Sequence, residues 1–475
     1  MPLPTHKTKI VCTIGPASQS PDVMERMLLA GMNIARLNFS HGDFVQHKAV
    51  IDNLRAASER TGCRLALLAD LSGPKMRIGK IADEPVELKI GERFTLTTDE
   101  IIGDVTRVSV SFDRLPQAVK PGDILFLNDG YIQLEVIESA APNVHCTVKV
   151  GGELRSRKGL NLPDIDLGIS AFTEWDHQCL KFALENGVDA VSQSFVERAA
   201  DIEAVRQASA ALGYAPFIIA KIERSGALDH IDEIMAATDG IMIARGDLGV
   251  EVPIEQIAVV QKRLMHLANM RAKPVITATQ MLESMTDNRR PTRAEATDVS
   301  NAIFDGTDCV MLSGESAMGK YPVEAVETLA KIAAAVEPHR PIVTVKELFP
   351  GINLSGKLRP PHLIALSVET CIEYMHPAAV FTPTHSGETA RRIAGFRLPV
   401  WTIAVSSRPS TCQILQFTQG VYPVCEPEHP DDWNTYARKW LQTHQLTGNY
   451  ALLTEGPSSK FPNANNRLEI IDLTR

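Results

Sequence analysis

Residues 217–251 constrain the fold of this chain more than any other stretch. Two apolar runs, 217–220 and 241–244, each end in charged residues. Between them, residues 229–237 place their apolar side chains at helical spacing. The pattern predicts a strand, a helix and a second strand, with charges at the same end of both strands. Parallel α/β proteins carry their chemistry at that end.

The same alternation recurs along the chain and predicts a (β/α)8 TIM barrel. Apolar runs of the parallel-strand type begin near residues 9, 33, 65, 189, 217, 240, 274 and 309, and a helical pattern follows each. Buried parallel strands are apolar on both faces, and these runs fit that description. A closed ring of strands would bring all of their C-terminal ends to one mouth.

Two departures from this alternation predict further domains. From about 78 to 160, short alternating runs and turn signals predict an all-β unit, with a hairpin at Asn128, Asp129 and Gly130. A proline-rich stretch at 338–360 predicts a boundary. We therefore expect barrel segments at 1–71 and 167–340, an inserted β-barrel-like lid domain at 72–166 and a C-terminal α/β domain at 341–475.

Composition excludes several classes of protein. The net charge is −9 and no strongly basic block occurs, which argues against nucleic-acid binding. The 8 cysteines are scattered without metal-ligand spacing, as expected of reduced, buried thiols. We see neither a signal sequence nor an apolar run long enough to span a membrane, so we expect a cytoplasmic protein without membrane attachment.

Three charged residues end the strands of the 217–251 unit. Glu223 and Asp247 are hard oxygen donors of the kind that Mg²⁺ prefers, and Lys221 would face a developing anion. The alternative is a buried salt bridge among strand ends. Three convergent charges on consecutive strands favour a site.

Many other polar residues lie at the same ends of the predicted strands. An anion pocket, a carboxylate pair and hydroxyl groups would then converge at the barrel mouth. This composition suits phosphoryl transfer, where positioning and charge neutralisation do most of the catalysis. The residues are Thr13, Arg36, Asn38, Ser40, Asp70, Ser194, Lys221, Glu223, Arg245, Asp247, Thr279, Gln280, Ser313 and Glu315.

Several long motifs carrying these residues resemble the pyruvate kinase family. They are MNIARLNFSHG, LLADLSGPKMRIG, RKGLNLPDID, AKIERSGAL, IARGDLGVEVP, TATQMLESM and PTRAEATDVSNAIFDGTDCVMLSGESAMGKYP. The similarity runs from about Lys7 to Val336 and weakens in the last third. It implies transfer of the phosphoryl group of phosphoenolpyruvate to ADP, giving pyruvate and ATP in the final step of glycolysis, by a bacterial-type homotetramer.

The resemblance also implies roles for individual residues. Catalysis would rest on Lys221, Thr279 and Arg36, and the substrate would contact these three and the segment Ala244, Arg245, Gly246 and Asp247. Mg²⁺ or Mn²⁺ would bind Glu223 and Asp247. The nucleotide would meet Arg77, Lys158 and His41, although His41 could instead cap a helix. The lid would hinge at residues 72–74 and near 164–166. Monovalent-cation ligands would be Asn38, Ser40, Asp70 and the carbonyl of Leu71.

One motif departs from the potassium-dependent members of the family. They read DTKGPEIRTG where this chain reads DLSGPKMRIG over 70–79, so Lys75 replaces a glutamate. Its ammonium group would supply the charge that K⁺ otherwise provides, as in potassium-independent members, and we expect activity without added K⁺. The alternative is that Lys75 points to solvent and the cation is needed.

The C-terminal domain carries a candidate effector loop. Residues 382–389 follow a predicted strand and open a helix, a setting that suits a phosphate group. A simple capped helix is the alternative. The resemblance implies an activator, and we expect a sugar monophosphate or a nucleotide because residues 454–459 opposite lack basic side chains. The loop residues are Thr382, Thr384, Ser386, Gly387 and Thr389.

Two rival functions follow from the same residues. A Mg²⁺-dependent lyase or aldolase acting on pyruvate or another oxo-acid would also use Glu223 and Asp247, but it would need neither ADP nor Arg77 and Lys158. A metabolite-sensing pseudoenzyme would not need an intact Lys221.

Overall fold

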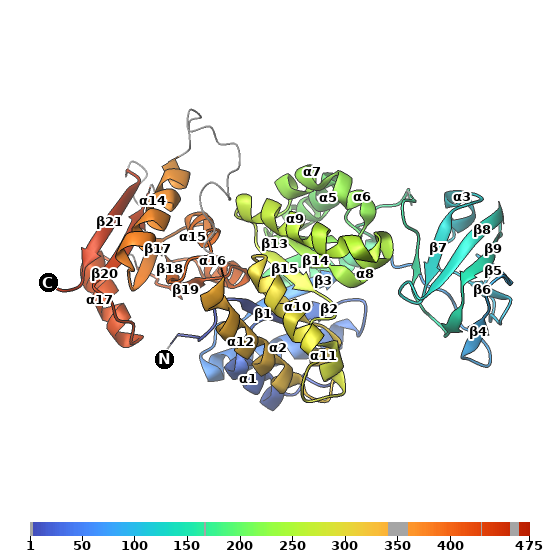
Figure 1. The fold of residues 1–475 in the computed structure, drawn as a ribbon, viewed down its shortest axis with the longest axis horizontal. Coiled ribbons are helices and arrows are strands. Elements are labelled where there is room, and N and C mark those ends of the chain that lie inside the picture. The colour runs from blue at the N-terminus through green and yellow to red at the C-terminus, as the bar shows by residue number, and fades with distance from the viewer. Residues whose placement is uncertain (1–2, 166–167, 341–359, 429, 457–464) are drawn as a thin grey trace.

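The computed structural model describes residues 3–165, 168–340, 360–428, 430–456 and 465–475. Three units lie in a row: a C-terminal α/β unit, a central barrel and a β unit at the far end (Figure 1). The predicted boundary stretch at 341–359 and residue Asp166 of the predicted hinge lie outside the described residues.

The central unit is a closed barrel with strand order β1-β16-β15-β14-β13-β12-β3-β2, which confirms the predicted TIM barrel. Neighbouring strands pair in parallel throughout. The strands are β1 (Lys9–Thr13), β2 (Met32–Asn38), β3 (Ala66–Leu71), β12 (Ala190–Gln193), β13 (Phe217–Ile222), β14 (Gly240–Ala244), β15 (Val275–Ala278) and β16 (Cys309–Leu312).

Helices surround the barrel and bury their apolar faces against it. Two of them begin with a reciprocal capping box, at Thr173 with Asp176 and at Thr292 with Glu295, which satisfies backbone N–H groups of the first turn. The main helices are α1 (Pro21–Ala30), α2 (Phe44–Thr61), α4 (Glu174–Glu185), α5 (Ala199–Ala211), α7 (Ile231–Ala237), α9 (Ile257–Met270), α10 (Arg293–Phe304) and α12 (Pro322–Val336).

The β unit is inserted between β3 and α4 and has its own apolar core, which includes Phe94 and Leu134. Its six-stranded sheet has the order β11-β7-β8-β9-β5-β6, and β10 pairs with β4 beside it. The predicted hairpin is present, since β7 and β8 pair antiparallel on either side of Asn128 and Gly130. The elements are β4 (Val86–Leu88), β5 (Arg93–Thr97), β6 (Arg107–Ser109), α3 (Leu115–Ala118), β7 (Ile124–Leu127), β8 (Ile132–Ala140), β9 (Asn143–Val150), β10 (Gly152–Leu154) and β11 (Leu160–Asn161). We call this unit the lid.

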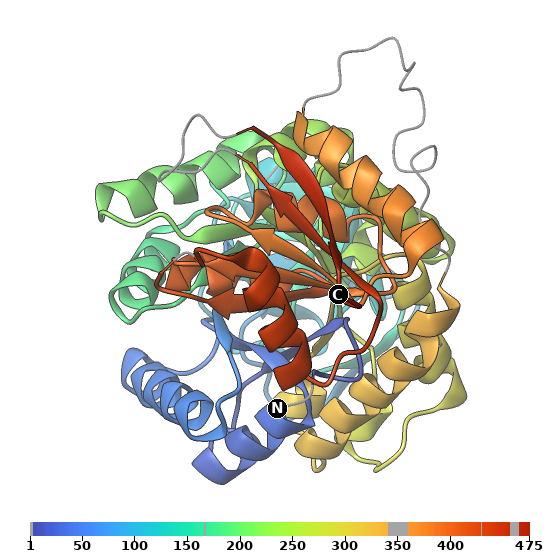
Figure 2. The same ribbon diagram turned by 90° about the vertical axis from the view of Figure 1, so that its left-hand side faces the viewer.

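The C-terminal unit is a five-stranded sheet of order β19-β18-β17-β20-β21, in which β21 is the antiparallel edge strand. It sits at the end of the barrel opposite the lid, and Figure 2 views the molecule from its side. Phe417 stacks on Phe217, and Arg397 donates to Asp308 (2.7 Å) just before β16. The elements are α14 (Pro360–Met375), β17 (Ala379–Pro383), α15 (Glu388–Ala394), β18 (Trp401–Ser406), α16 (Pro409–Ile414), β19 (Val421–Cys425), α17 (Trp433–Thr443), β20 (Tyr450–Glu455) and β21 (Arg467–Asp472).

Three short helices at the strand ends were not predicted. β14 stops at Ala244 because α8 (Arg245–Glu251) begins at once, and the residues that follow β16 form α11 (Gly314–Ala317). The helix expected at 229–237 is preceded by a separate α6 (Ser225–Asp229). Of these three helices, α8 carries the predicted site residues Gly246 and Asp247 in its first turn.

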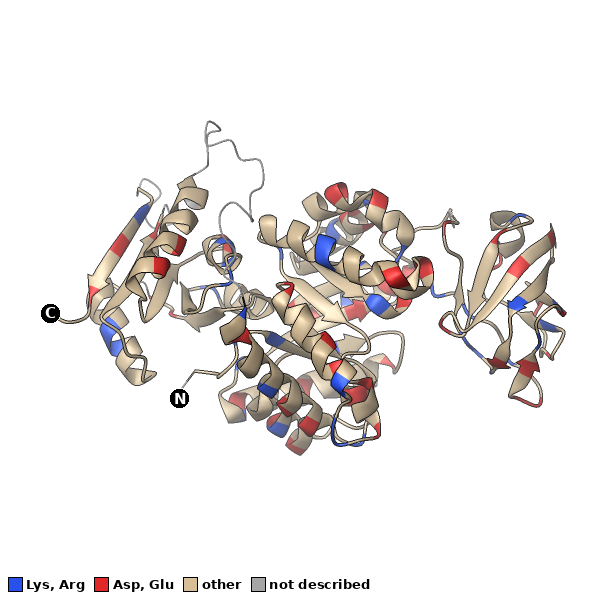
Figure 3. Cartoon of the chain, viewed as in Figure 1, with Lys and Arg blue, Asp and Glu red and all other residues tan. Residues whose placement is uncertain are grey.

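Acidic and basic residues are interspersed along the outer helices in the view of Figure 3. Among the described residues, no helix combines the length and the apolar character needed to cross a membrane.

Candidate active site

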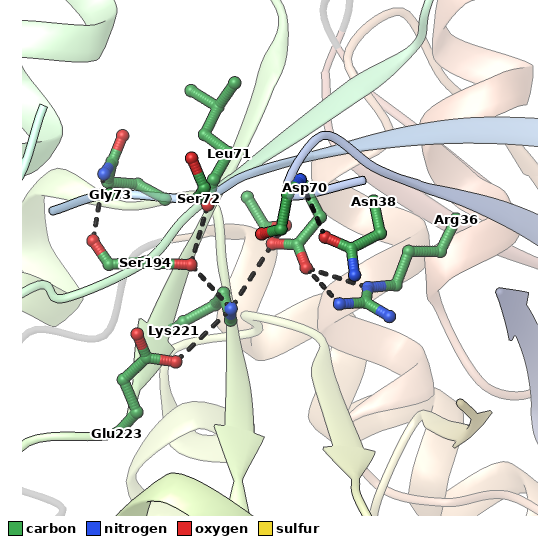
Figure 4. Close-up of polar contacts among 12 residues, drawn as sticks. Arg36, Asn38, Asp70, Leu71, Ser72, Gly73, Ser194, Lys221 and Glu223 are labelled. Carbon is green, nitrogen blue, oxygen red and sulfur yellow. Dashed lines mark hydrogen bonds and ion pairs between the residues drawn. The ribbon is translucent and has the colours of Figure 1, made fainter. Parts of the chain in front are cut away.

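Charged and hydroxyl side chains from β2, β3, β12 and β13 and the residues that follow them meet at the barrel mouth (Figure 4). Arg36 on β2 donates through Nε to Oδ2 of Asp70 on β3 at 2.8 Å. Its Nη1 donates to Oγ1 of Thr13 at 2.8 Å. Arg36 is therefore held in one orientation before any ligand binds, as a bidentate anion receptor requires.

Lys221 occupies the centre of this group. Its Nζ donates to Oγ of Ser194 at 2.6 Å and lies 3.3 Å from Oε2 of Glu223 and 3.5 Å from Oδ1 of Asp70. Burial disfavours the charge, but the two carboxylates outweigh it and raise the pKa of Lys221 above its usual value. The ammonium group is thus a fixed, fully protonated cation in a site shielded from water.

Asp70 is shared between the two cations. Its Oδ1 also accepts a hydrogen bond from Ser192 at 2.7 Å. Burial alone would raise the pKa of this carboxyl, but Lys221, Arg36 and the Ser192 hydroxyl hold it far below its usual range. Asp70 is ionised at any physiological pH and is fully occupied by protein partners.

Glu223 and Asp247 form the carboxylate pair that was predicted to hold a divalent cation. Oε1 of Glu223 accepts from the backbone N–H of Phe195 at 2.7 Å. Oε2 is buried without a hydrogen-bond donor, although Lys221 lies near it. Burial, and next to it the charge of Asp247, raise the pKa of Glu223 against the opposing effect of Lys221.

These features fit a divalent cation. A buried carboxylate oxygen without a donor and the exposed carboxylate of Asp247, one strand further on, are two hard ligands of the kind Mg²⁺ takes. In the described parts of the chain, no group of three or more His, Cys, Asp or Glu residues could hold a metal ion. The protein therefore offers two carboxylates, and water and substrate oxygens would complete the shell.

Thr279 follows β15 in a left-handed backbone conformation, with φ of 75°. A β-branched residue rarely adopts this region, and strain of this kind clusters at functional sites. Gly246 in the first turn of α8 lies so close that an added Cβ would be 2.7 Å from Cγ2 of Thr279. Only glycine allows the helix start and Thr279 to approach in this way.

The side chain of Arg245 is directed to the barrel wall. Its Nη2 donates to the carbonyl of Thr279 at 2.8 Å and lies 2.7 Å from Oδ2 of Asp298 on α10. Within the predicted substrate segment 244–247, the backbone of the first helical turn is therefore the part available to a ligand.

The predicted nucleotide contacts lie where the lid joins the barrel. Arg77 and Lys158 are on paired segments, because Ile78 donates its N–H to the carbonyl of Lys158 at 2.9 Å. Desolvation and neighbouring positive charges lower the pKa of His41, and these charges belong to Lys75, Arg77 and Arg36. The alternative that His41 caps α2 is wrong, since the side chain of Asp43 caps it.

The predicted monovalent-cation region is largely engaged by the protein itself. Oδ1 of Asn38 accepts from the N–H of Ser40 at 3.1 Å, and the carbonyl of Leu71 accepts from Ser194 at 2.7 Å. Lys75 was expected to supply the charge of K⁺, with a side chain that points to solvent as the alternative. Its side chain is exposed, and no ion pair within 4.0 Å joins it to another described residue.

Lys75 nevertheless interacts electrostatically with charged groups of the site. Desolvation at the mouth and repulsion from Lys221 lower its pKa, while the nearby carboxylates raise it. These carboxylates are Asp70, Glu223 and Asp247.

The structure places the effector-loop residues in the C-terminal unit, at the other end of the barrel. Gly387 has φ of 78° and donates its N–H to Oγ1 of Thr384 at 2.9 Å. Thr382 is buried on β17 and accepts from Thr454 at 3.3 Å, whereas Ser386 is exposed and Thr389 lies in α15. Glu455 opposite is paired with Arg467. Residues 457–459 of the predicted opposite wall lie outside the described residues.

Comparison with known proteins assigns the family. The model of the pyruvate kinase barrel domain matches residues 5–326, and that of the pyruvate kinase alpha/beta domain matches residues 362–471. The chain belongs to the pyruvate kinase family. It is an enzyme that transfers phosphoryl groups, which confirms the kinase predicted from its motifs.

Individual pyruvate kinases are similar over nearly the whole chain. That of Thermococcus litoralis is 47% identical over 430 residues, which cover 90% of each chain. That of Geobacillus stearothermophilus is 44% identical over 88% of this chain and 71% of its own length. The crystal structure of a pyruvate kinase from Cryptosporidium parvum superimposes with a TM-score of 0.91 at 33% identity, covering 99% of this chain and 96% of that one.

Sequence reasoning missed two contributors to the site. Ser192 orients Asp70, and Ser194, noted only as a polar strand end, connects Lys221 to the carbonyl of Leu71. Their signal was two serines at period two in and just after a buried strand, β12, which place their hydroxyls on one face. Glu315 accepts from backbone N–H groups of Leu282 and Ser313, and so has a structural role.

Proposed function

We propose that the barrel mouth transfers the phosphoryl group of phosphoenolpyruvate to ADP, which gives pyruvate and ATP and is the last step of glycolysis. The observation that carries the proposal is the buried, protonated Lys221 held between Ser194, Glu223 and Asp70. The bond between the enol oxygen and phosphorus breaks, and an oxygen of the β-phosphate of ADP takes the phosphoryl group. The enolate that remains is then protonated on carbon.

Lys221 and Arg36 neutralise negative charge in this scheme. Arg36 binds the phosphate of the substrate, and its orientation is fixed by Asp70 and Thr13. Lys221 stabilises the transferring group and the enolate oxygen. Fixed cations in a shielded site lower the barrier without solvent reorganisation, which supports these roles.

Glu223 and Asp247 would hold Mg²⁺ or Mn²⁺, which supplies charge neutralisation to the phosphoryl and enolate oxygens when bound. The backbone N–H groups at the start of α8 bind the substrate carboxylate, since the first turn of a helix has unpaired donors. Thr279 lies beside Gly246 and hence beside the substrate carbon, where its hydroxyl orders the water that delivers the proton.

The lid supplies the nucleotide site. Arg77 and Lys158 bind the phosphates of ADP together with His41, and the positive charges around His41 support this role. Closure of the lid would exclude water and prevent hydrolysis of the phosphoryl donor. We retain residues 71/72 and 166/167 as the boundaries of this domain, and 340/341 as the start of the C-terminal domain.

We also propose that the enzyme is potassium-independent. Asp70 and the carbonyl of Leu71 already accept hydrogen bonds from Arg36 and Ser194. Lys75 has an exposed side chain and is repelled by Lys221, but three carboxylates at the mouth attract its ammonium group. A cation supplied by the chain then takes the place of a bound ion.

The loop 382–389 is proposed to bind a sugar monophosphate or a nucleotide. The turn at Gly387 and the hydroxyls around it support a phosphate, while the acidic Glu455 opposes a second one. Saturation curves for phosphoenolpyruvate, measured with glucose 6-phosphate, ribose 5-phosphate, AMP and fructose 1,6-bisphosphate, test this. A homotetramer is proposed from the family resemblance, and sedimentation of the purified protein tests it.

The test of the proposed reaction is pyruvate formation from phosphoenolpyruvate with and without ADP. We expect turnover only when ADP and Mg²⁺ are both present, with one ATP formed per pyruvate. A lyase or an aldolase would release product without ADP, and a pseudoenzyme would release none. Either result would overturn the proposal.

A further inference from the structure

Arg224 follows β13 and contacts residues 162–165, the segment that returns from the lid to the barrel and is called the return segment below. Only 4% of the residue is exposed. Its Nε lies 2.9 Å from Oε1 of Glu197 and 3.6 Å from Oε2 of Glu251, and its Nη2 donates to the carbonyl of Ile165 at 2.9 Å. A buried cation therefore fixes a backbone group at the point where the chain re-enters the barrel.

Ser225 makes a second contact with the return segment. Its hydroxyl donates to Oδ1 of Asp164 at 2.8 Å, and its N–H donates to Oε2 of Glu251 at 3.3 Å. Glu251 is the last residue of α8 and is buried, with 6% exposed. Two consecutive residues of the return segment, Asp164 and Ile165, are thus held by Ser225 and Arg224. Glu251 at the end of α8 in turn contacts both Arg224 and Ser225.

The lid also rests directly on α8. The turn of the β7–β8 hairpin places Gly130, with φ of 89°, where an added Cβ would be 3.2 Å from Cγ2 of Val250. Figure 1 shows α8 on the side of the barrel that faces the lid. The first predicted hinge, residues 72–74, contacts α4 and not α8, because Gly73 donates its N–H to Asp176 of α4 at 3.1 Å.

One short helix therefore touches both halves of the site. The first turn of α8 carries Gly246 and Asp247, and its last turn carries Val250 and Glu251. If the lid moved away while α8 stayed in place, Arg224 would lose the Ile165 carbonyl and remain buried between carboxylates. Leaving a buried charged group without one of its hydrogen-bond partners costs free energy. The return segment and α8 are therefore expected to move together.

We propose that Arg224 is a positioning residue that couples α8 to the lid, so that a substrate at the first turn of α8 and a nucleotide beneath the lid strengthen each other's binding. The inference rests on the proposed roles of Gly246 and Asp247 for the substrate and of Arg77 and Lys158 for the nucleotide. Coupling of this kind is reciprocal in binding free energy.

The test compares Arg224→Gln with the wild type by hydrogen exchange and by kinetics. Hydrogen exchange of the backbone over 159–165 measures how firmly β11 and the return segment are held, independently of activity. We expect this exchange to be at least ten-fold faster in Arg224→Gln. In the wild type, we expect saturating phosphoenolpyruvate to lower the KM for ADP by about five-fold or more. In Arg224→Gln, we expect phosphoenolpyruvate to leave the KM for ADP unchanged, so that the ratio of the two KM values is about one. The kcat should change less than the KM for ADP.

Three further variants make the result specific. Arg224→Lys keeps the charge near Glu197 and restores part of the coupling. Ser225→Ala removes only the hydroxyl contact to Asp164, leaves the barrel core intact and gives a smaller change of the same kind. Arg206→Gln is the matched control, because Arg206 also binds a carbonyl and a carboxylate, those of Ala237 and Asp239, but contacts no lid residue among those described.

The outcomes separate this inference from the proposed function. Unchanged exchange over 159–165 in both Arg224→Gln and Ser225→Ala overturns the inference, as does an equal change in Arg206→Gln. Faster exchange over 159–165 in Arg224→Gln, together with a KM for ADP that no longer responds to phosphoenolpyruvate, supports the inference. Arg77→Ala and Lys158→Ala test the nucleotide site itself. If they leave the KM for ADP unchanged while Arg224→Gln loosens the hinge, Arg224 positions the lid and the proposed nucleotide contacts are wrong.

Discussion

Asp70 joins the two cations of the site, because its Oδ1 lies 3.5 Å from Nζ of Lys221 and its Oδ2 accepts from Nε of Arg36 at 2.8 Å. A single buried carboxylate thus sets the distance between the group proposed to bind the phosphate and the group proposed to hold the enolate. The geometry exists before substrate arrives, so little reorganisation remains for the reaction.

Replacing Asp70 should destabilise the fold as well as the site. Asp70→Asn leaves Lys221 and Arg36 without their shared anion, and breaking a buried pair costs about 3–5 kcal/mol. We expect a loss of about 3 kcal/mol in the free energy of unfolding, measured by urea denaturation. Asp52→Asn is the control, since the exposed pair of Asp52 with Lys48 should contribute less than about 1 kcal/mol. Equal losses in both variants would contradict this account.

The contact between Gly246 and Thr279 should be essential for turnover. A methyl group at 246 would lie 2.7 Å from Cγ2 of Thr279 and would push the helix start and Thr279 apart. We expect Gly246→Ala to lower kcat/KM about 100-fold, as small misplacements of reacting groups do. Gly249→Ala in the same helix is the matched control, because the nearest atom to its added Cβ is 3.8 Å away. If Gly246→Ala retained wild-type kcat/KM, the proposed packing would be wrong.

Lys9 should make stability depend on pH in the alkaline range. Burial between the barrel and Trp401 lowers its pKa to about 8, and its Nζ donates to the carbonyl of Val421 at 2.8 Å. The unfolded chain keeps a lysine pKa near 10.4 and so binds more protons between about pH 8 and 10.4, which makes the Lys9 contribution to stability rise with pH in that window. The rise amounts to about 3 kcal/mol. Urea midpoints of wild type and Lys9→Met should converge or cross between pH 8 and 10, and parallel curves would refute the burial of a charged Lys9.

Turnover should not require potassium. We expect wild type to be active in K⁺-free buffer, with less than a two-fold gain on adding K⁺, and Lys75→Glu to regain activity only with K⁺, because the substitution removes the positive charge at the mouth. Exposed Lys181→Glu is the control for the change of charge alone. A wild type that is silent until K⁺ is added would show that Lys75 does not replace the ion.

Much of the fold was predictable because its strands are buried on both faces and read as apolar runs between helical patterns. The start of α8 was missed because residues 245–247 follow the strand without a polar cap or an apolar period, so nothing local marks a helix. Tertiary contacts decide it, since Arg245 is drawn to Asp298 and to the carbonyl of Thr279.

The sequence predicted which residues form the candidate site better than it predicted how their side chains pair. Charges at successive strand ends identified Lys221, Glu223 and Asp247, but the sequence could not show that Arg36 and Lys221 already satisfy Asp70. For the same reason the sequence alone left open whether Lys75 points to solvent, and its side chain is exposed. Partners across a barrel depend on side-chain direction, which spacing along one strand does not determine.

The most direct test of the account is the rate of phosphoryl transfer in Lys221→Met. Methionine keeps most of the volume and removes the ammonium group, so the enolate loses its fixed cation. We expect kcat for ATP and pyruvate formation to fall about 1000-fold, a loss of the size seen for one preorganised donor, while Lys181→Met stays within two-fold of wild type and both variants remain folded by circular dichroism. A Lys221→Met enzyme that is folded and retains more than a tenth of the wild-type kcat would contradict the central role given to Lys221.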